Sequence, residues 1–388
     1  MKTVADKIAT YFQNWLGRRG KNRYLIIESL GKKIQVALAD INFGEKQIKV
    51  LRYYIVEKIQ QVRRTPFLNT LILALNSEEA TTVESVIHLK RVQPQAIITE
   101  SELDDLAFRA LWEFLNLYRS WAAKKMYVTD LNLVLVGIEA KDIWLGPHKV
   151  FNPLGFKGEN FSLKLKGTFI PQFLAPTIKN FKSWTKNLVI VESSSILTSA
   201  LDQRFHLVVH STDEQTIVFS LSKNELVYFK QFSWGKNNLI AILRKLLLID
   251  EETAKIIFDR YQNNQVSDTF KKLINKLMLQ ELNIFKGKFN LLLKNYKELN
   301  KAAPAFDFRF AFPDFFPWPK YFQGKLFDFN DWLKKQGFKV YFPGQEGSSL
   351  SGIQSSLLAL AVHSYLSPSY KILNQFLRRR AKWLISTL

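Results

Sequence analysis

The same succession of segments occurs twice along the 388-residue chain: a run of short β-strand patterns, then helical patterns. The first run covers residues 24–59, where three stretches rich in β-branched and aromatic residues, separated by turn residues, predict an antiparallel meander. The second run begins at residues 187–192. Its further strand patterns lie at 205–210, 216–221 and 225–232, and its helical patterns at 237–248, 250–261 and 267–300. This repetition of sheet followed by helices predicts an α/β chain.

A compact α+β insertion is expected between the two runs, at residues 99–182. Thr99 as N-cap with Glu102 three residues later forms a capping box, and the helical apolar period continues from there to about Lys124. Strand patterns follow at 131–136 and 162–169, on either side of turn residues. At about 150 residues per domain, the length suggests two or three domains.

Composition narrows the class of partner. Lys and Arg number 55 against 34 Asp and Glu, and the net charge of +21 predicts attraction to nucleic acid or to a lipid headgroup surface. Nucleic acid is the weaker expectation, because the basic residues are spread over the whole chain and no helix-turn-helix or RNP-type motif stands out. A hydrophobic content of 47% excludes a disordered chain. The lack of cysteine excludes disulfides, thiolate metal sites and cysteine nucleophiles, and is compatible with a reducing cytoplasm.

Both ends of the chain show helical amphipathicity. No segment has the length and apolarity of a membrane-spanning helix, and the N-terminus lacks the pattern of a secretory signal, so export is not expected. In residues 369–388 an apolar stripe is flanked by basic residues without any acidic one, which predicts a helix lying among lipid headgroups. The residues expected to insert are Leu373, Phe376, Leu377, Trp383, Leu384 and Leu388, and those expected to contact headgroups are Arg378, Arg379, Arg380 and Lys382.

Two alternatives stay open for these ends. An apolar stripe on a terminal helix also fits docking on the protein's own core. Residues 1–20 form a second amphipathic segment followed by basic residues, for which core docking and membrane insertion are equally compatible.

No motif for catalysis or metal binding is found. The five histidines show no metal-ligand spacing, and neither a phosphate-binding P-loop nor a G-x-S-x-G nucleophile elbow is present. Glycine is scarce, 16 in 388, although phosphate loops need it for close backbone approach to the anion. We therefore assign no catalytic residue and no metal site.

Several segments, in order, resemble the actin-like bacterial cell-division family FtsA. Residues 189–261 resemble its second half, Asn152 to Gly158 its Asp-Pro-x-Gly-Met-x-Gly turn, and Thr99 to Leu103 the start of its small inserted subdomain. The resemblance implies an actin-like (RNase H-like) two-lobed ATPase fold with an SHS2-type insertion and terminal amphipathic helices. The implied parts are an N-terminal helix 1–20, subdomain 1A 21–98, the insertion 99–182, the second lobe 183–368, and a membrane-targeting helix 369–388.

The sequence departs from the family at its nucleotide motifs. The second phosphate hairpin of the family is matched by residues 210–217, which contain no glycine and carry acidic residues. The degenerate positions are Glu28, Gly31, His210, Thr212, Thr216 and Gly235. By resemblance we expect no ATP hydrolysis and no bound cofactor, while an ATP- and Mg-binding actin-like ATPase stays an alternative.

The resemblance also implies a role and partners. It predicts a peripheral protein at the inner face of the cytoplasmic membrane that tethers FtsZ-type filaments, with the FtsZ C-terminal peptide and anionic lipids as partners and with self-association. A PilM-like role, as a platform for a type IV pilus inner-membrane complex, is the near alternative.

Overall fold

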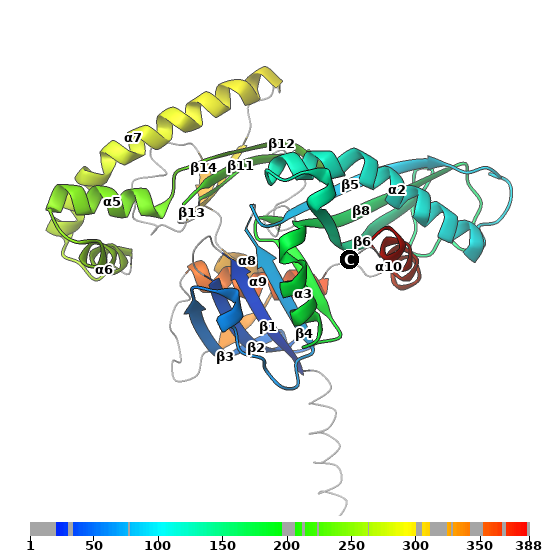
Figure 1. Ribbon diagram of the computed structural model, residues 1–388, viewed down its shortest axis with the longest axis horizontal. Coiled ribbons are helices and arrows are strands. Elements are labelled where there is room, and N and C mark those ends of the chain that lie inside the picture. The colour runs from blue at the N-terminus through cyan, green and yellow to red at the C-terminus, as the bar shows by residue number, and fades with distance from the viewer. Residues whose placement is uncertain are drawn as a thin grey trace, which may run out of the picture. The chain divides into compact units, whose positions relative to one another are not determined.

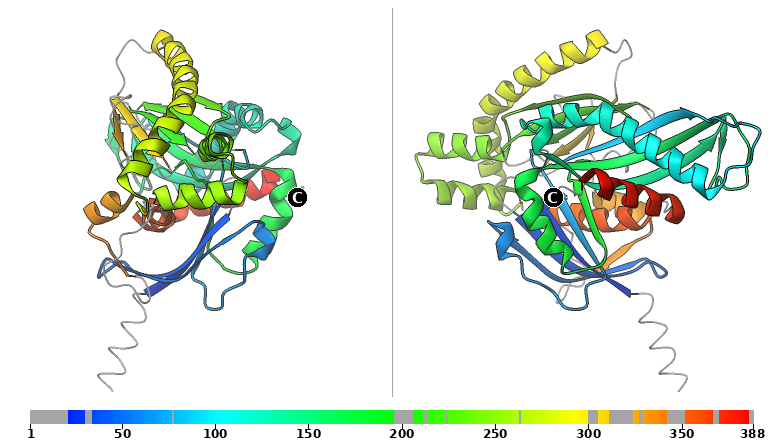
Figure 2. Two further views of the ribbon diagram at one scale, coloured as in Figure 1. Left: turned by 90° about the vertical axis from the view of Figure 1, so that its left-hand side faces the viewer. Right: turned by 45° about the vertical axis from the view of Figure 1, so that its right-hand side comes forward.

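The chain folds into two compact units, shown in Figure 1 and, from two further directions, in Figure 2. Unit 1 comprises residues 1–200 and 329–388, and unit 2 comprises residues 201–328. The computed structural model describes residues 21–29, 34–76, 78–195, 206–211, 214–222, 225–262, 264–299, 305–310, 324–326, 329–341, 352–366 and 370–385.

A six-stranded mixed sheet forms the body of unit 1, in the order β15-β3-β2-β1-β4-β9. Strands β1, β2 and β3 form the predicted antiparallel meander, and β4 and β9 extend the sheet in parallel from β1. β4 is buried throughout, as expected for a central strand in a sheet covered on both faces. The strands are β1 (Lys21–Ser29), β2 (Ile34–Asn42), β3 (Gln47–Val56), β4 (Thr70–Leu75), β9 (Leu188–Glu192) and β15 (Lys339–Tyr341).

Unit 2 repeats this strand order. Its sheet runs β12-β11-β10-β13-β14, with an antiparallel meander β10–β11–β12 and with β13 and β14 parallel to β10. Helices α5 (Lys236–Leu247), α6 (Glu251–Gln262) and α7 (Asp268–Leu299) pack a core that includes the buried side chains of Trp234, Phe258 and Phe285. The strands are β10 (His206–Ser211), β11 (Thr216–Ser222), β12 (Glu225–Phe232), β13 (Ala305–Phe310) and β14 (Gly324–Leu326).

Two units with the same meander, each extended by two parallel strands beside its first strand, have the strand order of the actin-like fold. The fold class predicted from the sequence is therefore confirmed.

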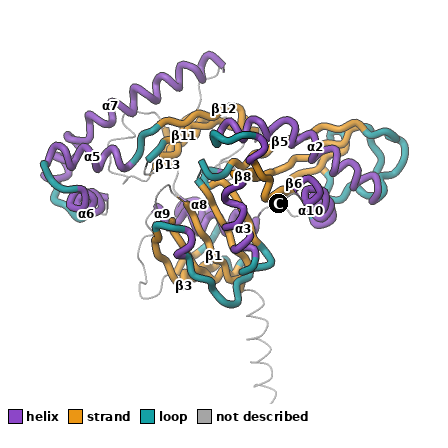
Figure 3. Tube along the Cα trace, viewed as in Figure 1, coloured by secondary structure: helices purple, strands orange, loops and turns teal. Residues whose placement is uncertain are grey.

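The insertion of unit 1 is a four-stranded antiparallel sheet, β5-β8-β6-β7, with α2 lying across one face (Figure 3). Thr99 caps α2 by accepting a hydrogen bond from the Glu102 amide at 3.3 Å, as predicted, but the Glu102 carboxylate pairs with Arg91 instead of completing the capping box. The elements are β5 (Thr81–Lys90), α2 (Glu100–Lys125), β6 (Leu133–Leu145), β7 (His148–Lys149) and β8 (Asn160–Pro171).

Three predicted domain boundaries are wrong. β9 is the edge strand of the first sheet, because it pairs in parallel with β4, so the second lobe does not begin at residue 183. The chain also returns to unit 1 near its end, through α8 (Phe329–Lys335), β15 and α9 (Gly352–Leu366), and β15 pairs with β3. The insertion begins at β5 instead of residue 99, since β5 pairs with β8 along its whole length.

The C-terminal helix α10 (Lys371–Ile385) is docked on the protein itself, alongside α2 and β6 (Figures 1 and 2). Leu373 is 2% exposed and Leu377 0%, and both belong to the core under α2, with Phe376 packed against it. The prediction that these three side chains insert into lipid is wrong, because the apolar stripe covers the core of the insertion. Trp383 and Leu384 have no described side chain, and Leu388 lies outside the described residues.

Polar contacts fix α10 in this position. The Ala140 amide, at a bulge in β6, donates to Asn374 Oδ1 at 2.7 Å in a buried hydrogen bond. Arg379 and Arg380 bind Asp104 of α2 at 2.8 and 2.5 Å while their side chains stay 58% and 34% exposed, so the headgroup role predicted for these two arginines stays a prediction. Burial would raise the pKa of Asp104, but the hydrogen bonds from the two arginines hold it below its usual value. Within the described residues, no helix is long and apolar enough to cross a membrane, and the predicted N-terminal helix 1–20 lies outside them.

Candidate functional site

Buried carboxylates lie at the carboxyl ends of the parallel strands in unit 1, the edge where open α/β sheets bind ligands. Glu28 is 0% exposed near the end of β1. The burial of Tyr53 and, to a smaller extent, the negative charge of Glu28 raise the pKa of Tyr53 to about 12. Glu79 follows β4. Burial raises the pKa of Glu79, although a hydrogen bond from Ser29 acts in the opposite direction. Gly31, the other degenerate position of this loop, lies outside the described residues. Negative charge at this edge disfavours a phosphate there.

Glu192, the last residue of β9, forms a buried ion pair with Lys125 at the end of α2. The Lys125 ammonium lies 2.8 Å from Glu192 Oε1, and the two side chains are 4% and 5% exposed. Glu192 also accepts hydrogen bonds from the Thr82 amide at 3.0 Å and from the Ser194 hydroxyl at 2.8 Å. The carboxylate is thus satisfied by three donors of the protein and joins the insertion to the first sheet.

In unit 2, the described strand ends at the matched second phosphate hairpin are hydrogen-bonded within the protein. The Thr216 hydroxyl lies 3.0 Å from the Ser211 hydroxyl and 2.8 Å from the Trp234 carbonyl, which it reaches as a donor, and all three residues are buried. His210 is 4% exposed, and Gly235 precedes α5 with its amide bound to Asn238 Oδ1 at 3.0 Å. Thr212 lies outside the described residues. Buried hydroxyls in such contacts serve the packing of the hairpin.

Unit 1 also contains a cavity of about 1130 Å³ between β6, β8, β9, α3 (Ala175–Lys182), α9 and α10. Its walls are largely apolar, with Val134 and Val136 from β6, Leu188 and Ile190 from β9, and Leu360 from α9. Its cationic lining, which gives it the name basic cavity below, consists of Lys141, Lys166, Lys179, Lys182, Lys186, Arg378 and Lys382. A pocket of this size, with apolar walls and several charged groups, is a candidate ligand site.

A ladder of buried charges crosses the insertion sheet at the wall of the basic cavity. Glu84 of β5 lies between Lys164 and Lys166 of β8, at 3.2 and 3.5 Å, and Lys141 of β6 donates to Glu139 at 2.8 Å. Burial would raise the pKa of Glu84, but the three lysines outweigh it and hold that pKa below its usual value. Burial lowers the pKa of Lys166. The three ammonium groups thus face two carboxylates.

His363 of α9 faces the same ladder and lines the basic cavity. Burial and the charges of Lys166 and Lys141 lower its pKa to about 3, so the imidazole is neutral at physiological pH.

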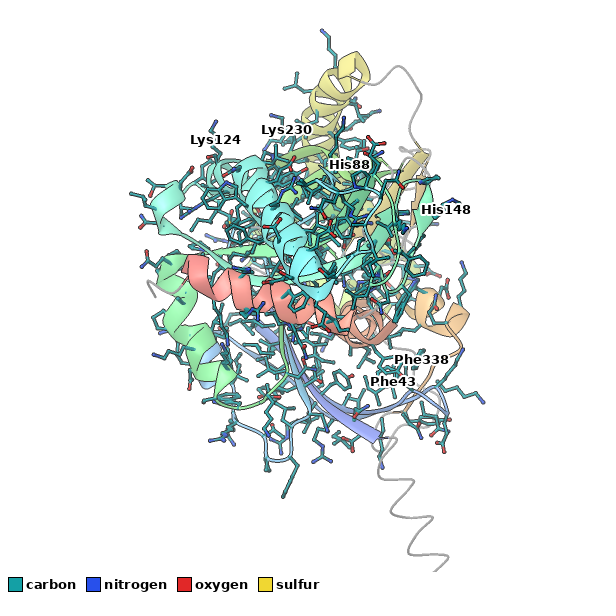
Figure 4. All side chains as sticks on the ribbon, turned by 90° about the vertical axis from the view of Figure 1, so that its right-hand side faces the viewer. Phe43, His88, Lys124, His148, Lys230 and Phe338 are labelled. Carbon is teal, nitrogen blue, oxygen red and sulfur yellow. The ribbon has the colours of Figure 1, made fainter. Side chains whose placement is uncertain are left out.

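The insertion itself contains two histidines, His88 and His148. His88 of β5 shares a hydrogen bond of 2.8 Å with Ser162, and His148 lies in β7; Figure 4 labels both. Within the part of the chain that the structure describes, no three His, Asp or Glu side chains are grouped so as to hold a metal ion.

Sequence reasoning placed the binding residues differently. Of the seven residues predicted to bind membrane whose side chains are described, Arg378 and Lys382 line the basic cavity. Lys125, Glu192 and the buried ladder were missed, because charged residues in strands and at a helix end look like solvated surface in the sequence. The sequence feature that indicates the ladder is the pair Lys164 and Lys166. Because they are two residues apart in a strand, both side chains lie on the same face.

Comparison with solved structures gives chains of the actin-like ATPase fold. A type IV pilus biogenesis complex, PilM-PilN, has 10% identity over 92% of this chain and 98% of its own, with a TM-score of 0.45. A Bacteroides thetaiotaomicron protein with an actin-like ATPase fold and unknown function has 10% identity over 88% of this chain and 97% of its own, with a TM-score of 0.34. MreB 5 of Spiroplasma citri bound to AMPPNP has 12% identity over 56% of this chain and 68% of its own, with a TM-score of 0.33.

No protein-family model matches the chain, and no curated protein matches it. The likeness to solved structures concerns the fold alone, and the strand order of the two units is the observation that assigns it.

Proposed function

We propose that this protein is an actin-like adaptor that binds partner proteins at the inner face of the cytoplasmic membrane without hydrolysing ATP. The observation that carries the proposal is the Lys125–Glu192 pair. Catalysis of phosphoryl transfer needs open carboxylates that hold a divalent cation beside the phosphates. At the carboxyl edge of the first sheet, the Glu192 carboxylate is instead bound by an ammonium, an amide and a hydroxyl of the chain itself.

The hydrogen-bonded strand ends of the hairpin in unit 2 support the same proposal. Thr216 and Ser211 bind each other, and the hairpin sequence lacks the glycines that would let its backbone approach a phosphate. Both units retain the actin-like strand order while these positions serve packing. Such a body is suited to scaffolding.

The membrane part of the proposal is supported by the net charge of +21 and by the amphipathic sequence of residues 1–20. The C-terminal helix no longer supports it, because Leu373 and Leu377 are buried. Sedimentation with vesicles of anionic phospholipid tests this part. The full chain should pellet with the vesicles, and a variant lacking residues 1–20 should stay in solution; equal pelleting of both would contradict the N-terminal anchor.

Two partner types fit the adaptor. The sequence resemblance puts an FtsZ-type filament first, and a type IV pilus complex is the alternative. An immobilised FtsZ C-terminal peptide and immobilised PilN, each offered to the full chain, distinguish them. Retention on one of them supports that partner, and retention on neither contradicts the adaptor role as stated.

A further inference from the structure

The charge ladder in the wall of the basic cavity has three ammonium groups and two carboxylates. The side chains of Lys141, Lys164 and Lys166 are 11%, 7% and 7% exposed, and the carboxylates that face them are those of Glu84 and Glu139, whose side chains are 17% and 38% exposed. The neighbouring His363 is neutral, and Arg378 adds a further positive charge beside Glu139. A buried excess of cations is costly unless an anion approaches it. The wall formed by Lys141 and Lys166 therefore favours an anionic group in the cavity.

The rest of the cavity is unsuited to a small, fully hydrophilic anion. Val134, Val136, Leu188, Ile190 and Leu360 line it, so most of a ligand deep inside would contact aliphatic side chains. Exposed lysines of α3 and of the turn after it stand at the opening. An aliphatic chain fits the apolar walls, and an anionic end group fits the lysines.

We propose that the basic cavity binds an anionic amphiphile, with a carboxylate or phosphate head at Lys141 and Lys166 and an aliphatic chain along the apolar walls. The head accepts hydrogen bonds from the two ammonium groups and neutralises the excess charge of the ladder. The aliphatic chain of the ligand is removed from water and contacts the apolar side chains of β6 and β9. This site lies wholly within unit 1 and does not depend on the proposed adaptor role.

The ladder supplies a matched pair of variants. Lys164 and Lys166 are equally buried and pair with the same Glu84, but only Lys166 lines the cavity. Lys166→Met should weaken binding of decanoate to the full chain roughly 10- to 100-fold, the range for hydrogen bonds to charged groups. Lys164→Met should leave it within about threefold, because that ammonium does not reach the ligand. Isothermal titration calorimetry at decanoate concentrations below micelle formation measures both.

Two further readouts do not depend on a buried substitution that can prevent folding. In the unaltered protein, octanoate, decanoate and dodecanoate should bind with affinity rising roughly fourfold for each added methylene. Arg378→Gln, at an exposed residue that lines the cavity, should weaken decanoate binding by a few fold. Decyl phosphate compared with decanoate identifies whether phosphate or carboxylate is the better head.

Several results would overturn the proposal. They are no decanoate binding by the full chain, an affinity equal to that of acetate or inorganic phosphate, and an equal loss in Lys164→Met and Lys166→Met. Binding of an acidic peptide that depends on Lys166, without any binding of decanoate, would replace the amphiphile by a protein segment.

Discussion

Removal of the Lys125 ammonium should destabilise unit 1 strongly. The substitution Lys125→Met keeps the length of the aliphatic stem but leaves the Glu192 carboxylate, 5% exposed, without its cation. The Thr82 amide and the Ser194 hydroxyl still donate to it, yet neither carries a charge. Breaking a buried ion pair by removing one partner costs about 3–5 kcal/mol. We therefore expect a loss of this size in the free energy of unfolding of unit 1.

A double-mutant cycle isolates the pair. Glu192→Gln keeps an acceptor for Thr82 and Ser194, so Lys125→Met combined with Glu192→Gln should cost less than the sum of the two single changes. Lys124→Met is the control: Lys124 is the exposed neighbour at the end of α2 (Figure 4), and its loss should stay within about 0.5 kcal/mol.

Urea unfolding of the full chain, followed by hydrogen exchange in β9 and the last turn of α2, measures these changes within unit 1. A cost below about 1 kcal/mol for Lys125→Met, or strict additivity in the double variant, would refute the argument that Lys125 neutralises a buried carboxylate.

Three further predictions concern the insertion and the cavity. Leu377→Ala, at a side chain that is 0% exposed under α2, should cost about 2–5 kcal/mol in urea unfolding, whereas Ile372→Ala, at a residue 40% exposed on the same helix, should cost far less. Gly167→Ala should cost about 1–3 kcal/mol, because its Cβ would lie 2.5 Å from the Phe114 ring; unchanged stability would show that the ring moves freely. Burial and neighbouring lysines lower the pKa of His363 from 6.5 to about 3. Between these two pH values His363 is protonated in the unfolded chain and neutral in the folded one, so the free energy of unfolding decreases as the pH is lowered. Between about pH 7 and 5 this contributes a loss of about 2 kcal/mol, which His363→Gln should abolish in urea titrations at the two pH values.

The periodicity of the sequence predicts the elements better than their partners. The meander of β1, β2 and β3 and the helices of unit 2 follow from β-branched runs and from the helical period, and both are observed. β9 was predicted as a strand but assigned to the wrong sheet, since an apolar run does not tell which distant strand it pairs with in parallel. Likewise, the apolar stripe of α10 tells which face is buried and not what covers it.

The candidate site was harder to predict than the fold. Lys164 and Lys166 alternate with apolar residues in β8, a pattern that usually means a solvated face. Both side chains are buried, and Lys166 lines a cavity whose other walls come from α9 and α10, which are distant in sequence. Lys125 and Glu192 meet only because the insertion folds back on the carboxyl end of β9.

Thermal unfolding of the full chain with and without Mg-ATP measures most directly whether this actin-like body uses a nucleotide. A ligand at 100 times its dissociation constant stabilises the folded state by about 2.7 kcal/mol. Because Glu192 is paired with Lys125 and Thr216 of the unit 2 hairpin is hydrogen-bonded to Ser211, we predict no shift of the transition at millimolar Mg-ATP. A shift that saturates with Mg-ATP, together with release of phosphate, would contradict the proposal of an adaptor without ATP hydrolysis.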